Sequence, residues 1–125
     1  MYWIVVIFLL FSCNESEELF QKEKQALILY KQGVQAVEDK DYQKAIVLFQ
    51  ESLEQDPNSK TIRYHLIEVR FSLEDYQDIP WLLRYNQEHP SDLDAIKLLR
   101  IYYCKQKDDR CNKLEEIIFF REQQQ

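Results

Sequence analysis

Residues 26–57, which read ALILYKQGVQAVEDKDYQKAIVLFQESLEQDP, decide the fold of this chain. Their pattern predicts two helices joined by a short turn, with Asp41-Tyr42 opening the second helix. Asp56-Pro57 closes that helix, because the residue before a proline is pushed out of α-helical geometry. A helix pair of this kind cannot bury its apolar face alone, so we expect it to pack against similar neighbours.

Small and aromatic residues predict how the two helices pack. Gly33 has no side chain, so two helices can approach closely there. A glycine inside a helix is about 1 kcal/mol less favourable than alanine, which makes a packing reason the natural explanation. Ala45 has the matching role in the second helix, and Phe49 fills the space between the two. We therefore expect Gly33, Ala45 and Phe49 to form the contact within the pair.

Two weaker copies of the pattern follow along the chain. Tyr64 and Tyr76 come 34 residues after Tyr30 and Tyr42, and this second copy spans residues 59–89. The third copy predicts helices over residues 92–105 and 109–121, and the tail at residues 122–125 is polar.

The second copy departs from the first at two places. Ile67 takes the position of Gly33, so we expect these two helices to lie further apart. Pro80 belongs to the first turn of a helix that starts near Ile79, where its missing N–H does no harm. Ile79 and Leu83 then stand where Ala45 and Phe49 stood.

Glycine, alanine, aromatic and proline at these offsets resemble the tetratricopeptide repeat. The resemblance covers residues 23–121 and implies an all-α fold of about three stacked antiparallel helix pairs. The packing positions that it implies are Gly33, Ala45, Phe49, Pro57, Ile79 and Leu83.

In this family the first helix of each pair lines a concave face that binds other proteins. Some members clamp a C-terminal carboxylate with lysine and asparagine, but Tyr30 and Val34 hold those positions here. The face is instead aromatic and apolar, which suits an amphipathic helix or an extended peptide. The partner-binding residues implied by position are Leu27, Tyr30, Val34, Val37, Thr61, Tyr64, Glu68, Phe71, Lys97 and Ile101, with Cys104 on the same face.

Composition excludes several classes of function. The chain has 125 residues, enough for one domain, and its single glycine argues against a phosphate-binding loop. The net charge is −6 with no basic block, so we expect no nucleic-acid partner. His65 and His89 lie far apart without ligand spacing, and no nucleophile motif is present. We therefore predict no metal, no cofactor and no enzymatic activity.

Residues 1–11, MYWIVVIFLLF, are entirely apolar but too short to cross a bilayer comfortably. With Ser12 and Cys13 they resemble a bacterial lipoprotein signal peptide, which implies lipidation of Cys13, membrane anchoring and a periplasmic or surface position in the cell envelope. An uncleaved anchor and a helix docked on the fold are the alternatives. Residues 13–22 would then be a polar linker or an extension of a first helix that begins near Ser16 and ends near Glu38.

Two further cysteines, Cys104 and Cys111, are expected on either side of the last helix–helix turn. The sequence favours two reduced, packed thiols and leaves a disulfide open, since an exported protein meets oxidising conditions.

Two functions follow from these observations. The first is a membrane-tethered adaptor that binds a protein or peptide in its groove. The second is a structural or assembly-factor subunit of an envelope complex, similar to a pilotin. This second function would use the apolar residues 117–120 of the last helix, which also leave room for self-association.

Overall fold

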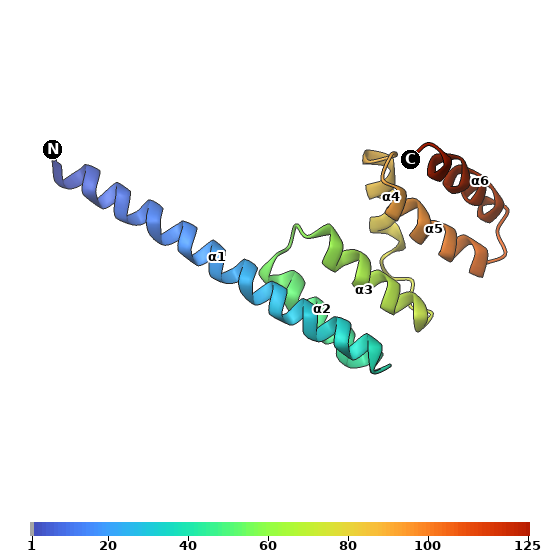
Figure 1. The fold of residues 1–125 in the computed structure, drawn as a ribbon, viewed down its shortest axis with the longest axis horizontal. Helices are drawn as coiled ribbons and strands as arrows, with labels where there is room; N and C mark the ends of the chain where they lie inside the picture. The colour runs from blue at the N-terminus through green and yellow to red at the C-terminus, as the bar shows by residue number, and fades with distance from the viewer. Residues whose placement is uncertain (1) are drawn as a thin grey trace. The chain divides into compact units, whose positions relative to one another are not determined.

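The computed structural model describes the backbone of residues 2–125 and the side chains from Asn14 onward. The described residues form six helices and no strand, which confirms the all-α, tetratricopeptide-like fold predicted from the sequence. In chain order they are α1 (Tyr2–Glu38), α2 (Tyr42–Gln55), α3 (Lys60–Ser72), α4 (Ile79–Glu88), α5 (Leu93–Lys105) and α6 (Arg110–Gln123) (Figure 1). The chain divides into two compact units, one ending at Arg63 and the other beginning at Tyr64.

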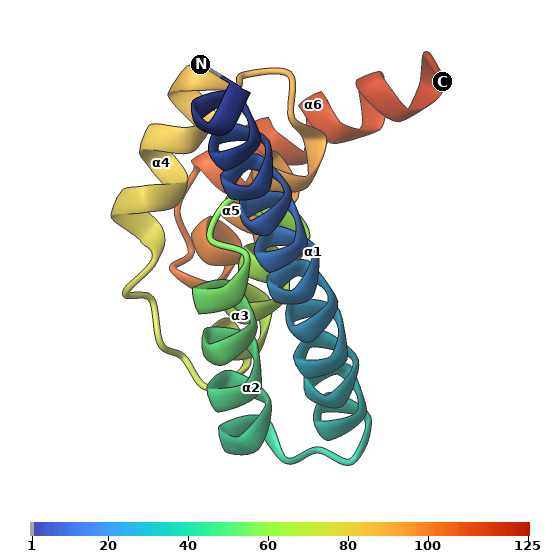
Figure 2. The ribbon, with the colours of Figure 1, turned by 90° about the vertical axis from the view of Figure 1, so that its left-hand side faces the viewer.

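In the first unit, α2 lies antiparallel along the C-terminal part of α1 (Figure 2). Ala45 and Phe49 are fully buried in α2, and Phe49 packs against the bare backbone of Gly33 in α1. Ser52 is also fully buried, and its hydroxyl donates a hydrogen bond of 2.6 Å to the carbonyl oxygen of Ala26. The hairpin therefore has an apolar contact near its turn and a polar one toward its open end.

α1 begins at Tyr2 and not near Ser16, so the predicted helix start was wrong. Ser16 lies inside the helix and does not cap its beginning. The physical reason is that no proline or glycine interrupts residues 2–25, so nothing in that stretch stops a helix once it has formed. The lipidation predicted at Cys13 concerns a side chain outside the described residues. Of the helices searched within the described part of the chain, none has both the length and the apolarity to cross a bilayer.

The second unit has its own apolar core. The core side chains share low exposure and come from the three helices α3, α4 and α5; they are Tyr64, Ile67, Phe71, Ile79, Leu82, Ala95, Leu98, Leu99 and Tyr103. α5 and α6 form an antiparallel hairpin, and α4 packs against α5. The backbones of α3 and α4 approach less closely than those of α1 and α2, as expected from Ile67 at the position equivalent to Gly33.

The packing position predicted at Leu83 was wrong by one residue. Leu82 is fully buried, whereas Leu83 is 37% exposed. α4 starts at Ile79 with Pro80 in its first turn, and its inward face uses positions three apart. In α2 the inward face uses Ala45 and Phe49, which are four apart, so the two helices present different registers to their cores.

The same turn ends the first helix of each pair. Lys40, Glu74 and Lys107 all have a left-handed backbone, with φ of 60°, 56° and 55°. The residue after each is an aspartate whose N–H bonds a carbonyl five residues back; these pairs are Asp41 to Ala36 at 2.8 Å, Asp75 to Arg70 at 2.9 Å and Asp108 to Tyr103 at 3.0 Å. This is the Schellman arrangement, which satisfies the last carbonyls of a helix. The internal repeat is therefore visible in the backbone of all three turns, including the two weaker copies.

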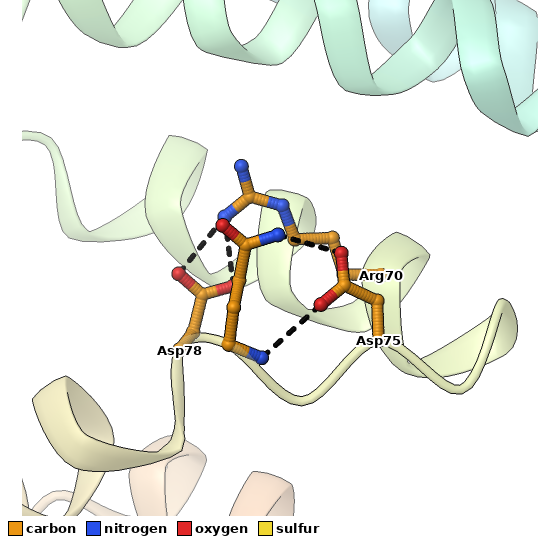
Figure 3. A network of polar contacts seen from close by, with 4 residues as sticks. Arg70, Asp75 and Asp78 are labelled. Atoms are coloured by element: carbon orange, nitrogen blue, oxygen red, sulfur yellow. Dashed lines mark hydrogen bonds and ion pairs between the residues drawn. The ribbon is translucent and has the colours of Figure 1, made fainter.

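A buried ion pair closes the second turn. Arg70 Nη1 donates to both carboxylate oxygens of Asp78 at 2.9 Å, and the two side chains are 9% and 11% exposed. Figure 3 shows this pair beside Asp75, whose carboxylate accepts from the backbone N–H of Gln77 at 3.1 Å. Arg70 thus ties the end of α3 to the residue that precedes α4.

Candidate functional site

Some of the predicted partner-binding residues in the first unit line a hollow of about 300 Å³. Three of them, Leu27, Tyr30 and Thr61, line it. The full lining comes from α1 and from the segment that joins α2 to α3: Glu23, Ala26, Leu27, Tyr30, Asp56, Ser59, Thr61 and Ile62. We call this the α1 hollow.

Helical spacing and two helix ends position this lining. Glu23, Leu27 and Tyr30 are four and three residues apart, so they share one side of α1. The Tyr30 ring is backed by Phe49, with the ring centroids 5.9 Å apart. Asp56 is the residue at which α2 ends, and the Ser59 hydroxyl accepts from Ile62 N–H at 3.3 Å, which starts α3. Leu27 remains 50% exposed, so an apolar side chain is presented at the edge of the hollow.

A second hollow, of about 360 Å³, lies within the second unit. Glu68, Phe71 and Ile101 line it as predicted members of the binding face, and Ile101 is 43% exposed. The remaining lining residues are Ser72, Tyr76 and Lys105. Lys105 forms an exposed ion pair with Glu74 at 3.7 Å, so the rim of this hollow is already partly neutralised.

Tyr64 was predicted as a binding residue, but it lies in the core. Its side chain is 6% exposed, and its ring packs edge-to-face with Trp81 and Tyr85, with the ring centroids 6.5 and 6.1 Å apart. Its hydroxyl donates to Asp92 Oδ2 at 3.1 Å, and the Tyr85 hydroxyl donates to the same oxygen at 3.2 Å. Burial, together with the Asp92 carboxylate, raises the pKa of Tyr64 well above its ordinary value. A tyrosine so enclosed has no surface left for a partner.

Phe71 is buried in the same way, at 7% exposure, and contributes only the wall of the second hollow. The reason is common to both aromatic residues. α3 is buried on more than one side, since Ile62, Leu66 and Val69 are also below 6% exposure. A helix with several buried faces cannot present the stripe of exposed side chains that was predicted for it from its position in the repeat.

The other predicted binding residues line neither of these two hollows. Val34 and Val37 are half-buried, and neither lines the α1 hollow. Lys97 is held in an ion pair with Glu122 at 2.8 Å. Cys104 forms a disulfide with Cys111, with the α-carbons 4.7 Å apart, so the alternative that the sequence had ranked second is the one present.

Sequence reasoning missed the polar residues of the α1 hollow. Asp56 was predicted only as a helix end and Glu23 was given no role, yet both line it. The available signal was the position of Glu23 one turn before Leu27. No local signal could have brought Asp56 to α1, because that approach depends on how the hairpin folds.

α6 carries the most exposed aromatic side chains in the described part of the chain. Phe119 and Phe120 are 66% and 67% exposed, whereas Ile118 on the same helix is buried. A shallow hollow of about 390 Å³ is lined by Glu116, Ile117, Phe120 and Arg121. This is the surface that the sequence assigned to docking or self-association.

One cluster of metal-type ligands occurs among the described residues, formed by Cys104, Cys111 and Glu115. The two sulfurs are joined to each other, so neither is a thiolate able to bind a metal. Glu115 is in turn paired with Arg100 at 3.1 Å. The arrangement is explained by a disulfide and an ion pair.

Comparison with known proteins adds one match. Residues 36–78, from the last three residues of α1 to the residue before α4, match the family model of the tetratricopeptide repeat. No curated protein and no solved structure matches the chain. Domains of this kind generally bind protein partners and are typically non-enzymatic adaptors. The matched repeat and the all-helical fold together support a tetratricopeptide-like protein.

Proposed function

We propose that this chain is a membrane-tethered, tetratricopeptide-like lipoprotein that acts as an adaptor and binds a peptide or helix of a partner protein. The observation that carries the proposal is the α1 hollow, where the half-exposed Leu27 stands beside Tyr30 and Thr61. A hollow with an apolar side chain at its edge can receive the anchoring side chain of a bound helix or extended peptide.

The proposed tether is the apolar segment 1–11 followed by Ser12 and Cys13. Lipid on Cys13 would hold the chain at a membrane of the bacterial envelope, on the periplasmic or surface side, without a spanning helix. The tether would restrict the search for a partner to one membrane surface. Binding would then depend mostly on buried apolar and aromatic side chains.

Site-specific photocrosslinking tests the adaptor function. A photoreactive phenylalanine at Leu27 should capture a specific protein in intact cells. The same residue at Val47, which is 51% exposed on α2 and does not line the α1 hollow, is the matched control. Equal capture from the two positions would contradict binding at this surface. Mass spectrometry of the purified chain shows in the same sample whether Cys13 carries lipid, and Cys13→Ser should release the chain from membranes.

A second function is favoured by α6. Its exposed Phe119 and Phe120 and the hollow beside Ile117 form an apolar surface that a structural or assembly-factor subunit of an envelope complex would use, or that a second copy would cover. Sedimentation of the full chain in detergent should then show association that rises with concentration and disappears in Phe119→Ser/Phe120→Ser. Leu73→Ser, at a site 39% exposed outside α6, should leave association unchanged.

A further inference from the structure

The α1 hollow has a marked charge asymmetry. Its lining holds two carboxylates, Glu23 and Asp56, and no basic side chain. Lys60 neighbours Thr61 in the chain but does not line the hollow. Neither carboxylate forms an ion pair with another side chain in the described part of the molecule. The apolar floor, made by Ala26 and Ile62 with Leu27 at its edge, therefore lies beside two carboxylates and no basic lining residue.

A second source of negative potential acts at the same place. The carbonyl groups at the C-terminal end of a helix carry roughly half a negative charge, and basic residues in the last turn usually offset it. α2 has no basic residue in its last turn; it has Glu54 there and ends at Asp56. The Asp56 carboxylate and the negative end of α2 thus reinforce each other beside the hollow.

We propose that the occupant of the α1 hollow is a basic, amphipathic protein segment in which a large apolar side chain stands next to a lysine or arginine. The apolar side chain would fill the hollow against Leu27 and Tyr30. The cation would lie between Glu23, Asp56 and the end of α2. The inference rests on the proposed adaptor function and adds the chemistry of its partner.

The geometry favours this occupant over an acidic or a neutral one. An acidic segment would place like charges together, and such contacts oppose association strongly. A neutral apolar segment would fill the floor but would leave the two carboxylates partly desolvated without a partner, which is unfavourable. A basic segment satisfies the floor and the rim together.

Selection from a random dodecapeptide phage library tests the proposal, using the full chain in detergent micelles. Peptides enriched on the wild type should carry lysine or arginine beside a leucine, methionine or phenylalanine. The variant Glu23→Lys/Asp56→Lys should enrich acidic peptides instead. The control Glu17→Lys/Glu38→Lys makes the same change of charge at exposed sites on α1 and should enrich the wild-type class.

Binding of one enriched peptide, measured by fluorescence anisotropy, gives the magnitude. The variant Glu23→Lys/Asp56→Lys should bind this peptide at least about tenfold more weakly than the wild type. The affinity of the wild type should fall as the salt concentration rises, because exposed charges are screened. Circular dichroism and the melting temperature show whether each variant keeps its fold.

The outcomes separate this inference from the adaptor function. Enriched peptides without a charge preference, or with the same preference on all three chains, would overturn the basic occupant while peptide binding itself stands. If no chain retains peptides above the empty support, the α1 hollow does not bind peptides, and both conclusions fail.

Discussion

The ring of Phe49 occupies the place that a side chain at Gly33 would need. A β-carbon built on Gly33 would lie 2.6 Å from Phe49 Cε1, a distance that atoms in contact do not reach. Phe49 is fully buried, so its ring has no open space into which it could turn. The two residues therefore set how closely α1 and α2 approach.

We predict that Gly33→Ala destabilises the chain although alanine is the better helix former. The helix propensity gained is about 1 kcal/mol, whereas overpacking a core costs about 1–3 kcal/mol. We expect a net loss of up to about 2 kcal/mol in the free energy of unfolding, measured by urea denaturation. Combining Gly33→Ala with Phe49→Leu should cost less than the two single changes added together, since the smaller side chain leaves room. Strict additivity of the two would contradict this contact.

The left-handed residues at the three turns lead to a prediction of the opposite sign. Lys40 has a φ of 60° and an exposed side chain. A left-handed backbone costs a residue with a β-carbon about 1–2 kcal/mol, and glycine avoids that cost but is more flexible when unfolded. Lys40→Gly should therefore stabilise the chain by about 0.5–1 kcal/mol. Lys44→Gly, four residues on inside α2, should destabilise it by about 1 kcal/mol. A loss of stability in both variants would show that the turn does not need this backbone conformation.

The ion pair between Arg70 and Asp78 should matter most when only one partner is removed. With both side chains about nine-tenths buried, Asp78→Ala leaves a guanidinium without its carboxylate. We expect a loss of about 3–5 kcal/mol in the free energy of unfolding. Arg70→Met/Asp78→Ala removes both charges and should be clearly more stable than Asp78→Ala. If the double variant is the less stable of the two, the cost arises from lost packing and not from an unpaired charge.

Tyr64 should make stability depend on alkaline pH. Because the pKa of Tyr64 is raised in the folded chain, its contribution is complete below about pH 10, the ordinary pKa of tyrosine. Above that pH the unfolded chain loses the proton while the folded chain keeps it, so stability falls by up to about 1.4 kcal/mol per pH unit.

Tyr64→Phe isolates this effect from the other tyrosines and lysines that titrate in the same range. At neutral pH the variant should be less stable by about 1–2 kcal/mol, since the hydrogen bond to Asp92 is lost. The deficit should shrink as the pH rises above 10, as measured by urea unfolding at several pH values. A difference between the two proteins that stays constant with pH would mean that Tyr64 is not shielded from ionisation.

The helices and their ends could be predicted because their causes are local. Asp41 and Asp92 cap α2 and α5 with their own carboxylates, Pro80 lies in the first turn of α4, and Pro57 follows the end of α2. The start of α1 was missed because the prediction treated a possible cap at Ser16 as a boundary. A cap residue favours a helix start but does not stop a helix that is already continuous.

Side-chain roles on α3 could not be predicted in the same way. Position within the repeat assigned Tyr64 and Phe71 to the exposed face, but whether a face is exposed depends on what packs against it. Asp92, 28 residues away, accepts the hydrogen bond that fixes Tyr64. Likewise, Asp56 joins Glu23 at one hollow only because the hairpin brings the end of α2 back to α1.

The order of residues alone therefore determined that this chain is helical, where five of its helices begin, and that one tight pair is built on Gly33, Ala45 and Phe49. These outcomes follow from backbone preferences and from spacing within a few turns of helix. Only the tertiary structure decided which aromatic residues are core, that Cys104 bonds Cys111, and that two carboxylates lie beside the α1 hollow. Those outcomes depend on how the helices pack against one another, because burial and distance between side chains are properties of the assembled fold.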